Sequence, residues 1–175
     1  MIAGLALALL LLGGAQAEAT PDDPPVAVAR TSAEALAAFD PLVGGVWRGA
    51  SISDPAIIDE LTFERVAGGQ AIRSIHSVNG GAYTGETLIV FDPGPKLLTS
   101  FYATNGGFYT TGTAEARGPG RFVFDQVVHG LDGVEAVQAT TAYENGVYSI
   151  RSRHRVRGEW VETGGFDYRR VAEAP

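Results

Sequence analysis

The chain contains no cysteine, which excludes disulfide bonds, thiolate metal sites and thiol nucleophiles. Basic residues are in the minority as well: 13 Lys and Arg stand against 20 Asp and Glu, a formal net charge of −7 at pH 7. This charge argues against binding to nucleic acid or to an anionic membrane surface. The length of 175 residues suits one domain with one core, whose stability must come from chain closure and packing.

The N-terminal residues have the pattern of an export signal. An apolar run over residues 5–12 is followed by two glycines and the small-residue cleavage pattern Ala15-Gln16-Ala17, although no Lys or Arg lies near the start. The apolar run is shorter than the ~20 residues that span a bilayer. The pattern predicts a periplasmic or secreted protein with a signal peptide over residues 1–17, a proline-containing extended tether over 18–30 and a folded domain over 31–175.

A short helix is predicted at the start of the folded domain. Ser32 precedes the alanine-rich stretch 33–39 as a candidate N-cap, and Asp40-Pro41 ends it. We expect the apolar side chains of Leu36 and Phe39 to plug one end of the structure that follows.

Beyond residue 45, turn-forming clusters recur at short, even intervals. Asn-Gly and Asp-Gly pairs recur among them and supply the positive φ angles of tight hairpins. Between the clusters lie about ten strand-length segments, at 46–52, 57–66, 70–78, 82–91, 97–104, 108–116, 121–129, 134–143, 147–156 and 159–170.

None of these connections is long enough for a crossover helix, which excludes a parallel sheet. The series therefore predicts an all-β, up-and-down antiparallel barrel of about ten strands, with a Greek-key sandwich as the alternative. Closure removes exposed strand edges, and a barrel of this size is wider than its own side chains fill. The Gly164-Gly165 pair predicts a bulge in the last strand.

Alternation along the strands assigns side chains to the two faces of the wall. Leu61 and Phe63 alternate with charged or hydroxyl residues and are predicted to face inward. An arginine row at positions 151, 153 and 155 is predicted to face outward, which turns Ser152 and His154 inward. The same reasoning places His76 inside.

Gly45-Val46-Trp47 opens the first strand and resembles the Gly-x-Trp signature of the calycins, the lipocalins and their relatives. The resemblance implies that Trp47 has a structural role, packed at the closed end of the barrel beneath an arginine from the last strand. Arg169 and Arg170 are the candidates for that arginine. Such a contact contributes ~0.5–2 kcal/mol.

The strand count is similar to that of the ten-stranded calycins, the fatty-acid-binding-like and nitrobindin-like barrels. Short pieces such as Trp47-Arg48-Gly49 and Phe91-Asp92-Pro93 also resemble uncharacterised bacterial lipocalin-like domains. For nitrobindin-like proteins the resemblance implies haem held by a histidine of the last strand. The segment 159–170 contains no histidine, which weighs against haem here.

In a meander of ten strands, His76, His129 and His154 all fall near the same end, opposite Trp47. Tyr83 follows an Asn-Gly-Gly turn at that end. We therefore expect a mouth that binds ligand through these four residues and Ser152. The alternative is that they are ordinary strand-end residues. A metal site formed by all three histidines is not expected, because their strands stand too far apart around a barrel.

No hydrolase motif supports an enzyme. There is no Gly-x-Ser-x-Gly elbow, and Asp54, Asp59 and Glu60 fit neither a calcium loop nor a paired-carboxylate site. Three hypotheses remain: an exported barrel that binds an apolar or amphipathic molecule, a haem-binding barrel with isomerase or nitric-oxide chemistry that uses His154 or His76, and a structural domain without a ligand. No metal, nucleic acid or integral membrane segment after signal cleavage is expected.

Overall fold

The computed structural model describes residues 31–171. The predicted signal peptide at 1–17 and tether at 18–30 lie outside the described residues. Within the described part, no helix has the length and apolar character to span a membrane.

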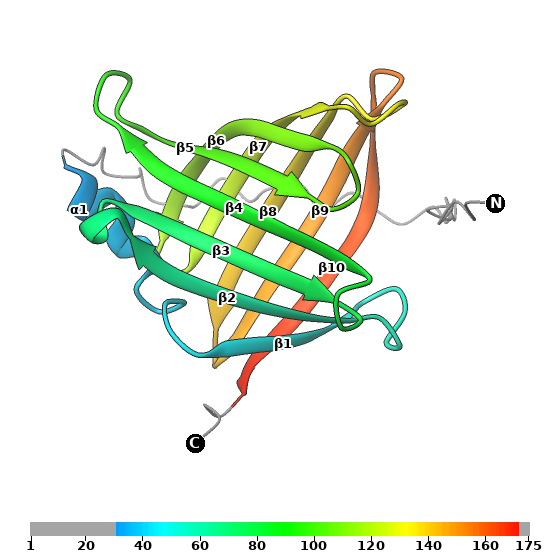
Figure 1. Cartoon of the computed structure of the whole chain (residues 1–175), viewed down its shortest axis with the longest axis horizontal. Helices are drawn as coiled ribbons and strands as arrows, with labels where there is room; N and C mark the ends of the chain where they lie inside the picture. Colours follow the sequence, from blue (N-terminus) through cyan, green and yellow to red (C-terminus); the bar gives the residue numbers. More distant parts are fainter. Residues whose placement is uncertain (1–30, 172–175) are drawn as a thin grey trace.

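Ten antiparallel strands form a closed barrel in up-and-down order (Figure 1). Each strand pairs with its neighbours in the chain, and the first strand pairs with the last, from Val46 opposite Val171 to Ser51 opposite Phe166. This confirms the predicted barrel and excludes the sandwich. The strands are β1 (Val46–Ser51), β2 (Ile58–Val66), β3 (Ala71–Val78), β4 (Tyr83–Asp92), β5 (Leu97–Thr104), β6 (Tyr109–Gly118), β7 (Arg121–His129), β8 (Ala136–Glu144), β9 (Val147–Val156) and β10 (Glu159–Val171).

The predicted bulge in the last strand is present. The pairing of β10 with β9 shifts register between Glu162 and Gly164, where one extra residue enters the ladder. The shift preserves the inward direction of the aromatic residues that follow, because Phe166 and Tyr168 lie opposite the inward-facing Ile150 and Tyr148.

The helix before the barrel begins one residue earlier than predicted. Its N-cap is Thr31 and not Ser32: the Thr31 hydroxyl accepts a hydrogen bond from the Glu34 backbone N–H, and the Glu34 carboxylate accepts one from the Thr31 N–H. This reciprocal capping box requires an acid three residues after the cap, a spacing that only Thr31 meets. The helix α1 (Ser32–Leu36) continues into a 3₁₀ turn, η1 (Ala37–Phe39).

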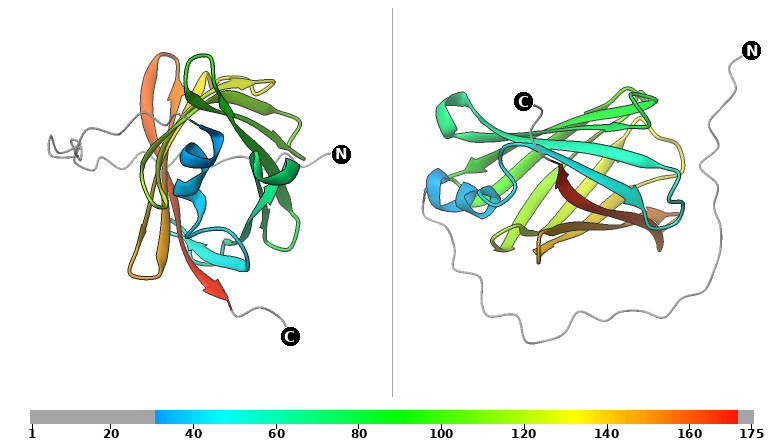
Figure 2. Two further views of the ribbon diagram at one scale, coloured as in Figure 1. Left: turned by 90° about the vertical axis from the view of Figure 1, so that its left-hand side faces the viewer. Right: turned by 90° about the horizontal axis from the view of Figure 1, so that it is seen from below.

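The helix contacts two connections between strands. The Gly120 N–H, between β6 and β7, donates to the Ala38 carbonyl at 2.7 Å, and the Ser32 hydroxyl donates to the carbonyl of Gln70 before β3 at 3.5 Å. Both connections belong to one end of the meander, here called the helix end; the opposite one is the far end. In the left view of Figure 2, the helix (blue) is seen within the outline formed by the strands of the barrel.

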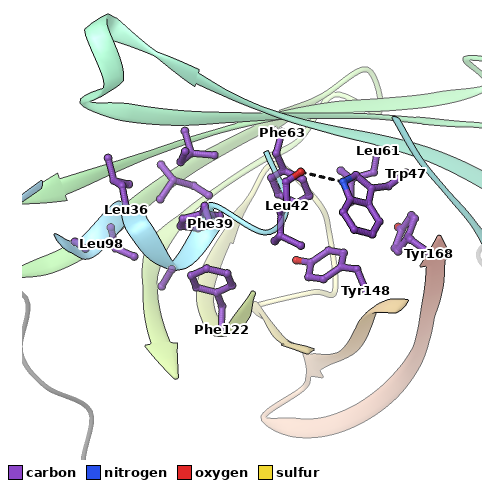
Figure 3. Close-up of a cluster of buried hydrophobic side chains, with 14 residues drawn as sticks. Leu36, Phe39, Leu42, Trp47, Leu61, Phe63, Leu98, Phe122, Tyr148 and Tyr168 are labelled. Carbon is purple, nitrogen blue, oxygen red and sulfur yellow. Dashed lines mark hydrogen bonds between the residues drawn. The ribbon is translucent and has the colours of Figure 1, made fainter. Parts of the chain in front are cut away.

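Side chains of the helix join inward-facing aromatic residues in one buried cluster (Figure 3). Phe39 is fully buried and stacks on Phe122 with ring centroids 4.0 Å apart. Tyr148 meets Phe63 edge to face at 5.7 Å. Fully burying such a side chain contributes ~1.5–3 kcal/mol, so each of these aromatic residues stabilises the fold. The predicted inward direction of Leu61 and Phe63 is confirmed, since both are buried.

Trp47 is fixed by contacts on two sides. Its indole N–H donates to the Leu42 carbonyl at 2.9 Å (Figure 3). On the other side, the Arg170 guanidinium lies 4.7 Å from the centre of the ring. The same guanidinium donates to the carbonyls of Pro41 at 2.8 Å and Gly44 at 2.7 Å. Of the two candidate arginines, Arg170 therefore covers the indole, whereas Arg169 is exposed on the outer face.

Along two strands, β7 and β9, burial of the inward-facing side chains decreases from the helix end to the far end. Along β9, Tyr148 is fully buried while Ser152 and His154 are only partly buried. Along β7, Phe122 is fully buried while Gln126 and Val128 are not.

Candidate functional site

The most deeply buried carboxylate among the described residues belongs to Asp59 on β2. It shares its inward direction with Leu61 and Phe63 and is only 3% exposed. Its neighbour Glu60 faces outward and pairs with Arg48 at 3.0 Å. The sequence groups Asp59 with Asp54 and Glu60. In the structure, Asp54 lies in the connection before β2, and alternation along β2 turns Glu60 to the opposite face.

Two groups contact the same oxygen of this carboxylate. The Tyr168 hydroxyl donates to Asp59 Oδ2 at 2.8 Å, and His76 Nδ1 lies 3.4 Å from it. The second oxygen, Oδ1, is buried and has no hydrogen-bond partner among the described residues. A buried carboxylate with one unsatisfied oxygen is energetically unfavourable unless water or a ligand completes its shell.

His76 continues the contacts toward the far end. Its Nε2 forms a hydrogen bond of 2.8 Å with the Tyr102 hydroxyl, which forms one of 2.7 Å with the Tyr83 hydroxyl. Tyr168, Asp59, His76, Tyr102 and Tyr83 thus form one continuous series of polar contacts, here called the polar chain. It leads from a buried acid to a partly exposed phenol.

Two inward-facing glycines make this arrangement possible. A Cβ on Gly85 of β4 would lie 2.6 Å from His76 Nε2 and closer still to Tyr102, and one on Gly49 of β1 would lie 2.7 Å from the Tyr168 ring. In each case the glycine sits on the strand between two members of the polar chain. Without a side chain there, a tyrosine can reach across that strand to its partner.

The phenols of Tyr102 and Tyr168 in the polar chain remain neutral. Burial, reinforced by the hydrogen bond with Tyr83 and by the Asp59 charge, raises the pKa of Tyr102 far above its ordinary value. Burial and the nearby Asp59 charge likewise raise the pKa of Tyr168. These groups therefore act as hydrogen-bond donors and acceptors at any physiological pH, not as bases.

No protein-family model matches this chain, and no curated protein is similar to it in sequence. The calycin resemblance therefore rests on the residues themselves, of which Trp47 and Arg170 are the best defined.

The structure brings only part of the predicted site together. His76 and Tyr83 both belong to the polar chain. Ser152 and His154 face the interior from β9, where the Ser152 hydroxyl lies 3.2 Å from that of Thr163. All three histidines lie in the half of their strands nearer the far end.

His129 does not face the interior. It lies on the same face of β7 as the exposed Val127, stacks on the exposed Tyr109 at 4.6 Å and forms a hydrogen bond of 3.0 Å with the Thr111 hydroxyl. The expectation that it lines the mouth placed it at the correct end of the strand but ignored the alternation, which turns Phe122 and Gln126 inward and His129 outward.

Sequence reasoning missed Asp59, Tyr102 and Tyr168. Asp59 could have been found from its alternation with Leu61 along the strand, which turns both side chains inward. The two tyrosines could have been found from the inward-facing glycine on the strand next to each of them. Sequence reasoning also missed a smaller polar group on the facing wall, where the Gln126 amide donates to the Ser100 hydroxyl at 2.8 Å and accepts from Thr110 at 3.0 Å.

The described residues contain no group of three or more His, Cys, Asp or Glu placed to hold a metal ion. For haem, His76 is a poor candidate, because Nε2 is hydrogen-bonded to Tyr102 and Nδ1 faces Asp59.

A pH dependence of stability follows from His154. Burial lowers the pKa of its imidazole in the folded chain, so the unfolded chain binds the proton more readily. The full contribution of neutral His154 to stability is therefore present above the ordinary histidine pKa of about 6.5. It falls as the pH drops through that value toward the lowered pKa of the folded chain.

We expect the melting temperature of His154→Gln to decrease less than that of the wild-type protein when the pH is lowered from about 8 to about 5. An equal or larger loss would contradict this role.

Proposed function

We propose that this protein is an exported barrel of the calycin type that binds a small apolar or amphipathic molecule in the far half of its interior. The supporting observation is the division of the interior: the helix end is filled by buried aromatic side chains, while inward-facing residues of the far half, such as Ser152 and His154, retain exposure. Export to the periplasm or the exterior is part of the proposal and rests on the pattern of residues 1–17.

In this proposal the two ends of the barrel have different roles. The helix, with Leu36 and Phe39 buried against the barrel wall, plugs the helix end, and Trp47 under Arg170 holds the first and last strands together there. The ligand enters at the far end, which is the natural site in a closed barrel with one packed end. Its polar group meets Tyr83, Tyr102 and His76.

Binding is favoured over catalysis by the protonation states of the site. General acid–base catalysis works best with groups whose pKa lies near the working pH. Tyr102 and Tyr168 are shifted away from that range, and Nε2 of His76 is already engaged by Tyr102. For the haem alternative, His154 is the remaining inward-facing histidine. No contact of His154 in the structure favours haem ligation over the binding of another small molecule.

The proposal is tested by filling the interior. Ala139 on β8 faces inward opposite Phe124 and Ser152, and its neighbour Thr140 faces outward. We expect the wild-type protein to enhance the fluorescence of the neutral dye Nile red, and Ala139→Trp to abolish the enhancement because the indole occupies the ligand space.

Thr140→Trp is the matched control, since it adds the same side chain to the outer wall and should leave dye binding within about twofold of wild type. Native mass spectrometry of protein from its own host should show a bound small molecule that Ala139→Trp lacks. A wild-type barrel that neither carries a molecule nor binds the dye would show that the domain is structural.

A further inference from the structure

The interior of the barrel has an unbalanced charge. Asp59 is the one buried carboxylate among the described residues, and it faces inward. The described Lys and Arg side chains lie on the outer wall, in turns or at the helix end, where Arg65 contacts Asp40 and Arg170 covers Trp47. The far half therefore holds one buried negative charge and no fixed positive charge.

The hydrogen bond to Asp59 does not balance that charge. The Tyr168 hydroxyl is a neutral donor, and His76 Nδ1, 3.4 Å from the same oxygen, forms an ion pair with the carboxylate only when the imidazole is protonated. Oδ1 is without a partner among the described residues. A cation that enters this environment relieves the desolvation of the carboxylate, whereas a second anion adds repulsion in a region of low dielectric.

Aromatic rings next to Asp59 add to the same preference. The His76 ring lies 5.4 Å from that of Tyr83 and 5.8 Å from that of Tyr102, and Phe108 is 6.4 Å from Tyr102. Aromatic faces carry partial negative charge and attract ammonium groups. The hydroxyls of Tyr83 and Tyr102 can in addition accept hydrogen bonds from an N–H donor.

We propose that the ligand of this barrel is a cationic amphiphile, an ammonium group on an apolar body, with the ammonium held near Asp59 among the rings of His76, Tyr83 and Tyr102. This inference rests on the proposed function and narrows it to one ligand class. Long-chain carboxylates are excluded from the site, because nothing in the far half compensates a second negative charge.

Three probes of equal chain length test the inference by isothermal titration calorimetry: octylamine, octanol and octanoate. At about pH 7 the amine is protonated and the acid ionised, so the probes differ in charge and share one apolar tail. We expect octylammonium to bind wild-type protein at least about tenfold more tightly than octanoate, with octanol between them. Asp59→Asn should remove that preference, so that octylammonium and octanoate bind with similar affinity.

Asp125→Asn is the matched control, because Asp125 is an exposed acid on the outer face of β7, and it should keep the wild-type preference. Octanoate binding as tightly as octylammonium would overturn the inference while leaving ligand binding intact. Failure of all three probes to bind would overturn the proposed function, and the inference with it. If Asp59→Asn does not fold, the comparison of probes on wild-type protein still decides between these outcomes.

Discussion

Replacing Trp47 by alanine is expected to destabilise the barrel by about 3–5 kcal/mol, the range for removing a large aromatic side chain from a core. Trp47 is 1% exposed and contacts Tyr143 and Tyr148 edge-on or tilted. The substitution also leaves the Leu42 carbonyl without its indole donor and removes the ring beneath Arg170. Urea denaturation monitored by far-ultraviolet circular dichroism measures the loss.

The second tryptophan of the chain provides the control. Trp160 is 42% exposed on the outer wall, where Arg153 lies 4.8 Å from its ring. Trp160→Ala should therefore lower the free energy of unfolding by no more than about 1 kcal/mol, the value of a surface cation–π contact. Similar losses at the two positions would mean that the Trp47 cluster does not dominate the core.

Gly85→Ala is expected to destabilise the fold by about 1–3 kcal/mol by overpacking, although it adds only one methyl group. The new Cβ would lie 2.6 Å from His76 Nε2 and closer to the Tyr102 ring. One of the two side chains must move, so the hydrogen bond between them should break. Urea denaturation measures the stability, and ultraviolet absorbance on alkaline titration should show Tyr102 ionising at lower pH once its ring moves toward solvent.

A double-mutant cycle separates this effect from backbone effects of the glycine. In a Tyr102→Ala background, the alanine at position 85 meets less steric conflict and should destabilise the fold by clearly less than it does alone. The same loss in both backgrounds would indicate that Gly85 is required for its backbone conformation, not for the crossing of Tyr102.

Much of this fold could be predicted from the sequence, because tight hairpins depend on local chemistry. Asn-Gly and Asp-Gly pairs require little beyond their own φ angles, and alternation sets the two faces of each strand. This reasoning was sufficient for the ten strands, the bulge near Gly164 and the inward direction of His154. The helix start was wrong by one residue, because Thr31 and Ser32 are equally good caps until the position of Glu34 is considered.

The candidate site could be predicted only in part. His76 and Tyr83 were found because they lie near turns with clear signatures. Tyr168 and Asp59 are more than a hundred residues apart and meet across Gly49, a contact that depends on barrel closure and on an absent side chain. For His129, the predicted position at the far end of its strand was correct, but the predicted inward direction of its side chain was wrong.

The pairing of β1 with β10 has a consequence for how the protein is assembled. Tyr168 and Arg170 belong to β10, the last strand of the barrel. They nevertheless complete the contacts of Asp59 on β2 and Trp47 on β1. A chain that lacks this strand has neither a finished core nor a finished polar chain. Under the proposed function, the barrel can therefore hold a ligand only once β10 has paired with β1.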